Sequence, residues 1–561
     1  MLMERYARAN FAGQQDFEQN FKIDVPENYN FAFDCIDELA ARQPDKTALV
    51  WCNDQGAQAT YSFSQLAAGM NAAARYFASL GVAKGDRVML MLKRRAQYWF
   101  VFLGLMKLGA VAIPATHQLT KKDIVYRCNA ANVAAIVAAD DDMLLDSITQ
   151  ALPEAPTVRH LVCLNARGDW QDLDRGMQAF REGAALPRVT KNNDMMMLYF
   201  TSGTTGMPKM VAHNHAYPLA HIATARFWHN LHPGSLHLTV ADTGWAKCAW
   251  GKMFGQWLCE AAVFVYDHER FNAKELLEVV ARHKVTSFCA PPTVYRFLIK
   301  EDLSDVDLSH LEYVTTAGEP LNPEVFQQFK DATGLELHEC YGQTETTPLV
   351  ITSPYMRPRP GSLGRPSPAY DLVLLDADGN EVPPGEEGEI CVRTGPAGQP
   401  GVFMGYQQDD LLNERAWRFG VYHTGDIARL DADGYLWFIG RGDDVIKSSG
   451  YRIGPFEVES VLMEHPAVLE CAITGIPDAV RGQVVKATVV LAKGFEASKT
   501  LMRELQDFVK RNTAPYKYPR VVEFVKTLPK TISGKIQRAV IRENERTPQA
   551  RPRLVAETSG A

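Results

Sequence analysis

The sequence predicts an α/β protein: a large N-terminal domain of two covered, mostly parallel sheets with a small β region, hinged to a small mobile C-terminal α/β domain. Three observations support this fold class. The chain has 561 residues, more than one compact core normally holds. Strand-like and helix-like stretches alternate from about residue 31 to residue 300 and again over residues 311–345, as in parallel sheets covered by helices. Turn dipeptides then become frequent, which indicates short antiparallel strands.

The first half of the chain shows the alternation in regular order. Residues 85–92 begin as a glycine turn and continue as an apolar strand, and residues 134–139 form another short apolar run. Residues 271–284 have helical spacing and lead to a strand at residues 285–290, which two prolines end. Short apolar strands separated by helices are typical of a parallel sheet.

The same order returns once more before the turns become frequent. Residues 313–316 suit a strand, and Asn322 followed by Pro323 is the start signal of a helix that Gly334 ends. Residues 335–338 are predicted to form the next strand. We find no internal repeat in the sequence.

Composition divides the chain into parts. Residues 354–368 are rich in Pro, Arg and Gly and begin the small β region. Residues 441–446 are short and charged, which suits a hinge between an N-terminal domain of residues 1–440 and a mobile C-terminal domain of residues 447–545. Residues 546–561 are expected to form a disordered tail.

Composition also narrows the class of protein. A net charge of −7 with 46% hydrophobic residues is ordinary for a globular protein and argues against a nucleic-acid partner. The ten cysteines are scattered without disulfide or zinc spacing, so we expect a reducing compartment. The longest apolar run, residues 98–106, is too short to cross a bilayer, and the first residues lack an apolar signal region. We therefore expect a cytoplasmic protein without stable membrane insertion.

The most informative segment is a loop rich in hydroxyls and glycines that ends in a lysine. Glycines let backbone N–H groups approach an anion, hydroxyls add rotatable donors, and Lys209 adds a mobile charge. Pro208 stands where a Walker A loop needs its second glycine, so this is a different kind of phosphate loop; a plain surface turn is the alternative. The loop residues are Thr201, Ser202, Gly203, Thr204, Thr205, Gly206 and Lys209.

Three later segments carry the other groups that a nucleotide site needs. Residues 341–345, Tyr-Gly-Gln-Thr-Glu, follow a predicted strand and offer an aromatic face, a hydroxyl and a carboxylate able to hold Mg²⁺. Residues 422–426, Tyr-His-Thr-Gly-Asp, place an acid where it can accept both hydroxyls of a ribose. Residues 529–535 place a second lysine, Lys535, on a loop with a glycine. Each segment alone also fits a structural turn.

Taken in this order, the four segments resemble the core motifs of the adenylate-forming superfamily, which includes acyl-CoA synthetases, luciferases and the adenylation domains of peptide synthetases. The resemblance covers about residues 30–542, and residues 441–452 resemble the hinge motif. Residues 241–245 and 445–454 are most similar to acetyl-CoA and medium-chain acyl-CoA synthetases. The resemblance implies an N-terminal AMP-binding domain and an acid–thiol ligase. Such an enzyme uses ATP, Mg²⁺ and coenzyme A to convert a carboxylic acid to acyl-AMP and then to acyl-CoA.

The resemblance also implies roles for individual residues. Lys535 is the catalytic lysine of adenylation, Thr344 meets the α-phosphate and Glu345 ligates Mg²⁺. Asp443 is the hinge residue about which the C-terminal domain rotates, exchanging the Lys535 loop for residues 445–451. Nucleotide contacts are implied for the loop above and for Gly318, Glu319, Pro320, Glu339, Tyr341, Thr344, Asp426, Arg441 and Arg452. Coenzyme A contacts are implied for Ser449, Gly450 and Tyr451.

The acyl pocket is predicted from two places. Gly342 stands where acetate-activating relatives carry tryptophan, so we expect a pocket for branched acids or acids of about four to eight carbons, since each buried methylene contributes about 0.8 kcal/mol. Trp245, Lys247 and Trp250 lie in a segment that contributes to the acyl site in relatives. The alternative makes them core aromatics with a surface lysine. If they line the pocket, the tryptophans shorten it and favour short, branched or aromatic acids.

Other functions share parts of this pattern. The alternatives are a benzoate-type aromatic acid–CoA ligase, an adenylating enzyme that loads a carrier protein, a luciferase-like oxygenase and a non-catalytic nucleotide-binding regulator. No carrier segment follows Lys535, and a regulator has no need of that distant lysine. The oligomeric state is open between monomer and homodimer.

Several polar groups have a structural interpretation beside a functional one. The histidines between His213 and His237 lack a carboxylate or cysteine to complete a zinc site. Arg94 and Arg95 are interpreted as solvated surface residues, with the 3′-phosphate of coenzyme A as the alternative, and residues 516–520 are the other candidate for that phosphate. Lys535 is a candidate for acylation that removes its charge and switches the enzyme off.

Overall fold

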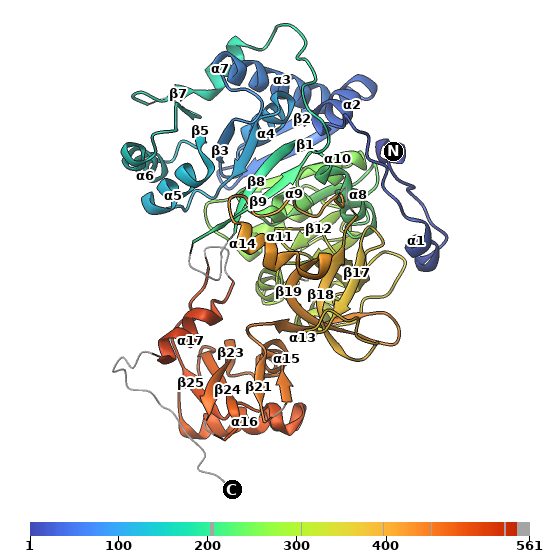
Figure 1. The fold of residues 1–561 in the computed structure, drawn as a ribbon, viewed down its shortest axis with the longest axis vertical. Coiled ribbons are helices and arrows are strands. Elements are labelled where there is room, and N and C mark those ends of the chain that lie inside the picture. The colour runs from blue at the N-terminus through green and yellow to red at the C-terminus, as the bar shows by residue number, and fades with distance from the viewer. Residues whose placement is uncertain are drawn as a thin grey trace.

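The computed structural model describes residues 1–165, 167–201, 207–303, 306–395, 398–449, 451–478, 480–531 and 535–546. Figure 1 shows a large body that holds the N-terminus and a smaller body below it, with α17 on the side of the smaller body nearer the large one. The predicted α/β class is confirmed. The expected tail lies outside the described residues apart from the last residue of α17.

The largest sheet has nine strands with a parallel centre and antiparallel edges. Its order is β16-β15-β14-β13-β12-β10-β11-β1-β2, and pairing is parallel from β14 to β1. The strands are β1 (Thr47–Asn53), β2 (Gln58–Ser62), β10 (Leu236–Thr239), β11 (Ala262–Asp267), β12 (Ser287–Ala290), β13 (Tyr313–Thr316), β14 (Leu337–Tyr341), β15 (Val350–Ile351) and β16 (Arg365–Pro366).

A second sheet of seven strands, in the order β7-β6-β5-β3-β4-β8-β9, lies in the same body (Figure 1). All pairs are parallel except the β8–β9 hairpin. The two mostly parallel sheets of the prediction are thus present. The strands are β3 (Arg87–Met91), β4 (Val111–Pro114), β5 (Val133–Ala138), β6 (His160–Cys163), β7 (Gln171–Asp172), β8 (Met195–Thr201) and β9 (Lys209–Asn214).

Two smaller sheets follow. The small β region is a four-stranded antiparallel sheet, and a five-stranded sheet forms the small body. The first contains β17 (Asp371–Leu375), β18 (Glu387–Arg393), β19 (Val421–Leu430) and β20 (Leu436–Arg441). The second contains β21 (Ile446–Ser448), β22 (Tyr451–Ile453), β23 (Val468–Asp478), β24 (Gly482–Leu491) and β25 (Val521–Phe524). The chain passes from one sheet to the other between β20 and β21, where the hinge is predicted.

The helices pack around these sheets. Those of the large body are α1 (Gln14–Asn20), α2 (Glu38–Arg42), α3 (Phe63–Ser79), α4 (Gln97–Leu108), α5 (Lys121–Ala131), α6 (Asp142–Ala151), α7 (Leu173–Ala179), α8 (Tyr217–Phe227), α9 (Ala246–Gly251), α10 (Phe254–Leu258), α11 (Ala273–Arg282), α12 (Pro292–Leu298), α13 (Pro323–Thr333) and α14 (Asp410–Ala416). Those of the small body are α15 (Pro455–Met463), α16 (Lys499–Asn512) and α17 (Arg538–Arg546). Short helical turns lie at Leu2–Arg5, Ala32–Asp37, Leu152–Glu154, Arg418–Gly420 and Pro515–Lys517.

Local signals account for several boundaries. Asn322 Oδ1 accepts a hydrogen bond from the Glu324 N–H at 2.7 Å and starts α13, and Gly334 ends it with a φ of 75°. The apolar run at residues 98–106 lies inside α4 and is buried on every side. None of the helices among the described residues has the length and apolarity that crossing a membrane requires.

The small body has a hydrophobic core of its own. Ile453, Val458, Leu505 and Val522 belong to this cluster, which is separate from the cores of the large body. β23 is long, Val468–Asp478, because it pairs with β24 along its length. A separately cored unit can move as one piece, which suits the predicted hinge.

Candidate active site

The centre of the site is a buried carboxylate on β19, Asp426, which is 5% exposed. Tyr341, the last residue of β14, donates a hydrogen bond from its hydroxyl to Asp426 Oδ2 at 2.6 Å. Arg441, the last residue of β20, donates from Nη1 to Oδ1 at 3.3 Å. Strand ends of two different sheets therefore meet at Asp426 and bring three of the predicted nucleotide residues together.

Gln343 completes the surroundings of Asp426 and is a residue that the sequence analysis missed. Its Nε2 donates to Asp426 Oδ2 at 2.5 Å and to the Thr424 carbonyl at 2.9 Å. Its Oε1 accepts a hydrogen bond from the Tyr422 hydroxyl at 2.8 Å. The available signal was its place in the middle of the 341–345 motif. Gln343 links the two motifs and holds the acid in one orientation.

A bulge in β19 projects Asp426 toward the site. Between Glu389 and Cys391, β18 advances two residues while the facing part of β19 advances four, so the extra residues loop out. Gly425 in the bulge has a φ of 76°, which favours glycine. Its N–H donates to Glu389 Oε1 at 2.9 Å. Glu389 therefore supports the predicted ribose turn, a role that no motif indicated.

Glu345 and Lys209 meet on the predicted phosphate side. Glu345 is 9% exposed, and its Oε1 accepts a hydrogen bond from the Tyr406 hydroxyl at 2.8 Å. Lys209 Nζ lies 5.1 Å from the centre of the Tyr406 ring. Burial lowers the pKa of Lys209, and the Glu345 carboxylate offsets part of this effect. Tyr406 joins the two charged residues. Glu345 offers the oxygen ligand that Mg²⁺ prefers, so its chemistry fits the predicted metal.

β9 supports the same turn. His213 donates from Nε2 to the Thr344 carbonyl at 2.7 Å. Burial lowers the pKa of His213 to about 4, so its imidazole is neutral at physiological pH. Lys209 begins β9 and lies opposite Thr201 at the end of β8. The predicted loop residues outside the described part of the chain are Ser202, Gly203, Thr204, Thr205 and Gly206.

The loop after β13 contains the predicted adenine contacts Gly318, Glu319 and Pro320. Gly318 has a φ of 107°, a conformation that favours glycine. Glu319 Oε2 lies 3.5 Å from Arg296 Nη2. Glu339 is 4% exposed and accepts a hydrogen bond from the Leu321 N–H at 3.1 Å. Burial raises the pKa of Glu339 well above its ordinary value. Glu339 thus holds the end of this loop, and its contact with nucleotide stays a prediction.

Helix α9 brings Lys247 and Trp250 to the loops after β13 and β14. A Cβ placed on Gly342 would lie 2.9 Å from Trp250 Cη2, so Trp250 occupies the space beside the glycine. The larger acyl pocket expected from Gly342 therefore stays a prediction, with Trp250 beside the glycine. Lys247 is not a surface residue: its Nζ donates to the Ala317 carbonyl at 2.7 Å, and burial lowers its pKa. Trp245 precedes α9, and its place in the pocket stays a prediction.

The charge of Lys535, in the small body, affects the pKa of two groups of this site. Burial raises the pKa of Asp426, and the charges of Arg441 and Lys535 offset part of that rise. Burial lowers the pKa of Lys247, and the charge of Lys535 lowers it further. Lys535 is itself exposed. Its ammonium group therefore lies within electrostatic reach of both the predicted ribose side and the predicted acyl side.

Two predicted residues at the junction make other contacts. Arg452 Nε lies 3.1 Å from Glu387 Oε2 of β18, so Arg452 pairs with a carboxylate of the large body. Asp443 is exposed, with Oδ1 3.9 Å from Arg441 Nε. The structure does not place Arg452 among the groups around Asp426. Its phosphate contact and the hinge role of Asp443 stay predictions.

Two of the predicted coenzyme A residues lie at an exposed turn: Ser449 is part of it, and Tyr451 begins β22. Tyr451 is 51% exposed and stacks on Tyr516 with ring centres 4.1 Å apart and planes 14° apart. Arg481 Nη1 donates to Ser449 Oγ at 3.3 Å. Gly450 lies outside the described residues. The turn and the basic 516–520 stretch, two separate candidates in the sequence, therefore meet on one surface.

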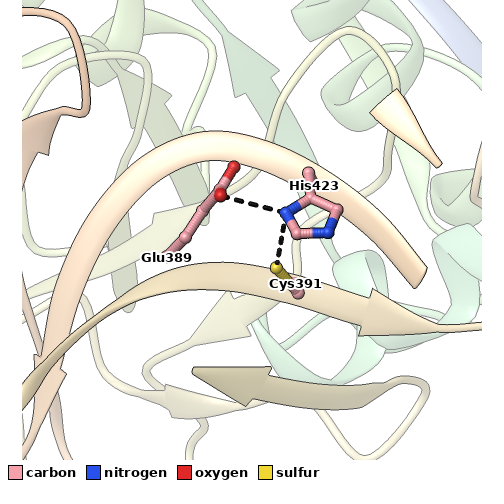
Figure 2. Close-up of side chains that lie close together, drawn as sticks. All are labelled: Glu389, Cys391 and His423. Carbon is pink, nitrogen blue, oxygen red and sulfur yellow. Dashed lines mark hydrogen bonds and ion pairs between the residues drawn. The ribbon is translucent and has the colours of Figure 1, made fainter. Parts of the chain in front are cut away.

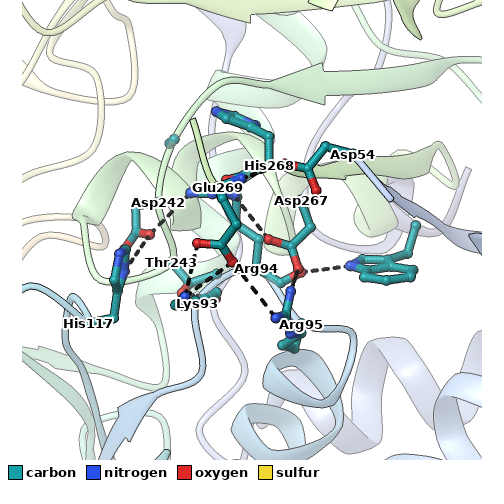
Figure 3. Close-up of polar contacts among 12 residues, drawn as sticks. Asp54, Lys93, Arg94, Arg95, His117, Asp242, Thr243, Asp267, His268 and Glu269 are labelled. Carbon is teal, nitrogen blue, oxygen red and sulfur yellow. Dashed lines mark hydrogen bonds and ion pairs between the residues drawn. The ribbon is translucent and has the colours of Figure 1, made fainter. Parts of the chain in front are cut away.

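Arg94 and Arg95 belong to a partly buried ion-pair network (Figure 3). The Arg94 side chain is 13% exposed and lies 3.3 Å from Asp242. Arg95 pairs with Asp267, and Lys93 lies 3.1 Å from Glu269. The interpretation as solvated surface arginines is wrong. Because carboxylates pair with both guanidinium groups, neither arginine is a free cation for the 3′-phosphate of coenzyme A.

The large body holds Tyr341, Glu345, Asp426 and Arg441 by hydrogen bonds and ion pairs, and the small body adds an exposed lysine, Lys535. This is the arrangement expected of the adenylate-forming class. The chain belongs to the AMP-binding enzyme family, which matches residues 36–407, and residues 457–535 match the AMP-binding enzyme C-terminal domain. The family predicted from the motifs is confirmed.

Individual relatives agree over nearly the full length. The chain is 39% identical to the mitochondrial acyl-coenzyme A synthetase ACSM3 of Pongo abelii, covering 96% of this chain and 93% of that one. It is 41% identical to the mitochondrial acyl-coenzyme A synthetase ACSM4 of Homo sapiens, covering 93% and 91%. The solved structure of the anthranilate CoA ligase AuaEII with anthranoyl-AMP has a TM-score of 0.85 at 29% identity, covering 93% and 98%.

Proposed function

We propose that this chain is an AMP-forming acyl-CoA synthetase that converts a short- or medium-chain or branched carboxylic acid to its CoA thioester. The observation that carries this function is the meeting of Tyr341, Gln343 and Arg441 at the buried carboxylate of Asp426. The positive charge of Lys535, from the small body, also offsets part of the rise that burial causes in the pKa of Asp426. ATP, coenzyme A and the acid are the substrates, and Mg²⁺ is the cofactor.

In the first step, a carboxylate oxygen attacks the α-phosphorus of ATP, forming acyl-AMP and releasing pyrophosphate. Negative charge builds up between the carboxylate and the phosphate, so cations placed there lower the barrier. Lys535 is assigned this position, and Lys209 is assigned the leaving phosphates. Mg²⁺ held by Glu345 would neutralise phosphate charge. Asp426 orients the ribose through its two carboxylate oxygens.

In the second step, the thiol of coenzyme A attacks the acyl carbon and AMP leaves. Lys535 must then move away, because the role assigned to it in the first step places it beside the acyl carbon that the thiol attacks. We assign this movement to rotation of the small body at residues 441–446, with Asp443 as the pivot. The exposed Tyr451–Tyr516 pair beside Arg481 offers an aromatic face and a positive charge for the nucleotide end of coenzyme A.

The preferred acid follows from the contact between Trp250 and Gly342. Trp250 closes the side that the glycine leaves open, so the pocket should end sooner than a glycine alone implies. We therefore expect branched acids and acids of about four to eight carbons to be preferred over acetate by about tenfold or more in kcat/KM, as each buried methylene adds about 0.8 kcal/mol.

A panel of acids with ATP, measured with and without coenzyme A, tests the function. Pyrophosphate release with acids of increasing length should rise and then fall, and AMP and acyl-CoA should appear when coenzyme A is present. Acetate as the best substrate would contradict the proposed pocket. Acyl-AMP that passes to a carrier protein but not to free coenzyme A would favour the carrier-loading alternative.

The compartment and assembly are also proposals. We keep the cytoplasm as the expected compartment, although the mammalian relatives named above are mitochondrial. Subcellular fractionation with an antibody to the chain distinguishes the two. Nucleic acid is not expected among the partners, and light scattering of the purified chain separates monomer from homodimer.

A further inference from the structure

Three potential metal ligands lie together beside the turn at residues 424–426, which presents Asp426. Glu389 and Cys391 are alternate residues of β18, and His423 lies opposite Cys391 on β19, so the three side chains share one face (Figure 2). Their ligand atoms all lie within 4.8 Å of one another. Cys391 Sγ is 3.3 Å and Glu389 Oε2 is 2.9 Å from the same atom, His423 Nδ1.

The other imidazole nitrogen shows how His423 is oriented. His423 Nε2 lies 3.0 Å from the Arg418 carbonyl, which can only accept, so Nε2 carries the hydrogen. A metal-binding histidine usually donates its second N–H in this way. The other ring nitrogen, Nδ1, faces both the Glu389 oxygen and the Cys391 sulfur and is the atom that a metal ion would bind.

We propose that Glu389, Cys391 and His423 form a binding site for a thiophilic divalent cation of the zinc type. Carboxylate oxygen, thiolate sulfur and imidazole nitrogen are the ligands that Zn²⁺ uses, and three protein ligands leave a fourth position for water. Bond lengths of about 2.3 Å to sulfur and about 2.0 Å to nitrogen place those atoms about 3.5 Å apart at a tetrahedral angle. The 3.3 Å observed between sulfur and nitrogen needs little adjustment. Binding displaces the thiol proton to solvent.

The location gives the ion a role in nucleotide binding, a part of the proposal that rests on the assigned ribose contact of Asp426. Glu389 uses Oε2 toward His423 while its Oε1 accepts the Gly425 N–H at 2.9 Å. Thr424 Oγ1 donates to the Ile390 carbonyl at 2.7 Å. An ion bound by both β18 and β19 here would restrict the motion of the turn that presents Asp426. By the same coupling, bound nucleotide would strengthen the binding of the ion.

Arg418 is the internal competitor of this ion. Its Nη2 lies 2.5 Å from Glu389 Oε2, and its side chain is 49% exposed. A half-exposed arginine can swing into solvent when a metal takes the carboxylate oxygen. Removing the positive charge of Arg418 should therefore strengthen metal binding. If Arg418 served only to stabilise the fold, its removal would not have this effect.

The test measures Co²⁺ and Zn²⁺ binding to the full chain. Co²⁺ should produce a thiolate charge-transfer absorption, and dialysis should retain one Zn²⁺ per chain in the presence of excess Mg²⁺, which prefers oxygen ligands. Cys391→Ser and His423→Gln should each weaken Zn²⁺ binding by at least about tenfold and remove or shift the absorption. Arg418→Met should tighten binding severalfold while the fold, followed by circular dichroism, stays unchanged.

Matched variants give the controls. Cys163→Ser changes another buried cysteine, and His465→Gln changes a histidine that pairs with Glu504 at 3.2 Å; neither should affect binding. Glu345→Gln should leave the Co²⁺ spectrum intact, which separates this site from the assigned Mg²⁺ ligand. If Co²⁺ produced no charge-transfer absorption in the unmodified chain, or if Cys163→Ser reduced this absorption as much as Cys391→Ser, the metal site would be overturned. The three side chains would then form only a hydrogen-bond network. AMP should bind about fivefold more tightly with Zn²⁺ present, and unchanged AMP affinity would overturn the coupling.

Discussion

The large and small bodies supply their parts of the site in opposite ways. In the large body, Asp426 and Glu345 are 5% and 9% exposed and are held by hydrogen bonds from neighbouring side chains. In the small body, Lys535 is exposed and Tyr451 is 51% exposed. We expect groups needed in both half-reactions to be fixed before substrate arrives, and groups that must exchange to be exposed.

The difference in burial between the two bodies corresponds to two tasks: preorganising the site in the large body and exchanging groups at the site from the small body. Burial raises the pKa of Asp426 and thus costs free energy, which the partners Tyr341, Gln343 and Arg441 offset. An exposed lysine has no such cost and can leave the site repeatedly. The small body has a separate core, so the proposed rotation would not require it to unfold.

The largest expected effect comes from removing the mobile cation. Lys535→Ala should reduce acyl-AMP formation by about 10²–10³-fold or more, because it removes charge stabilisation of the transition state. Thioester formation from supplied acyl-AMP should be spared. Single-turnover assays of the two half-reactions measure this. Lys530→Ala, in the same segment but paired with Glu470 at 2.6 Å, is the control. Equal loss of both half-reactions would contradict the assignment of Lys535 to acyl-AMP formation alone.

A hinge variant tests the movement itself. Asp443→Pro restricts φ and should hold the small body in one conformation, leaving one half-reaction and slowing the complete cycle by about tenfold or more. Asp443→Ala keeps backbone freedom and should preserve both half-reactions. Unaltered turnover of both halves in the proline variant would place the pivot elsewhere.

A smaller effect on acid preference is expected from Gly342 and Trp250, the neighbouring residues of the predicted acyl pocket in the large body. Gly342→Trp needs space that Trp250 occupies, so it should shift preference toward shorter acids and destabilise the fold by about 1–3 kcal/mol through overpacking. Trp250→Ala should shift preference toward longer acids. The double variant should regain stability relative to Gly342→Trp. Thermal unfolding and kcat/KM for acids of three lengths measure both effects, and additive losses of stability would show that the two positions do not share space.

The smallest effect concerns pH. The pKa of His213 is lowered to about 4 in the folded chain, so its contribution to stability is present above the ordinary histidine pKa near 6.5 and is lost as pH falls toward 4. Between pH 7.5 and 5.5 this group should cost about 1.4 kcal/mol of unfolding free energy. Urea unfolding of His213→Gln, which keeps a donor for Thr344, should show a shallower decrease. The half-exposed His232→Gln should keep the slope of the unmodified chain.

Contiguous motifs made much of the site predictable. Tyr341 and Asp426 lie in short segments whose residue types reveal their chemistry, and the structure joins them at 2.6 Å. Tyr406 and Glu389 were missed because nothing in their own segments indicates a partner. The helix signals at Asn322 and Gly334 were local and correct, whereas the length of β23 depends on pairing with β24.

The sequence alone determined the fold class, the family and the proposed reaction, because the loop from Thr201 to Lys209, the 341–345 and 422–426 motifs and Lys535 keep their chemical character and their order along the chain. The tertiary structure decided which groups touch. It placed Trp250 against Gly342, paired Arg94 and Arg95 with carboxylates, and brought Cys391 and His423 together behind Asp426. Burial and charge pairing depend on residues far apart in the chain, so no local pattern can report them.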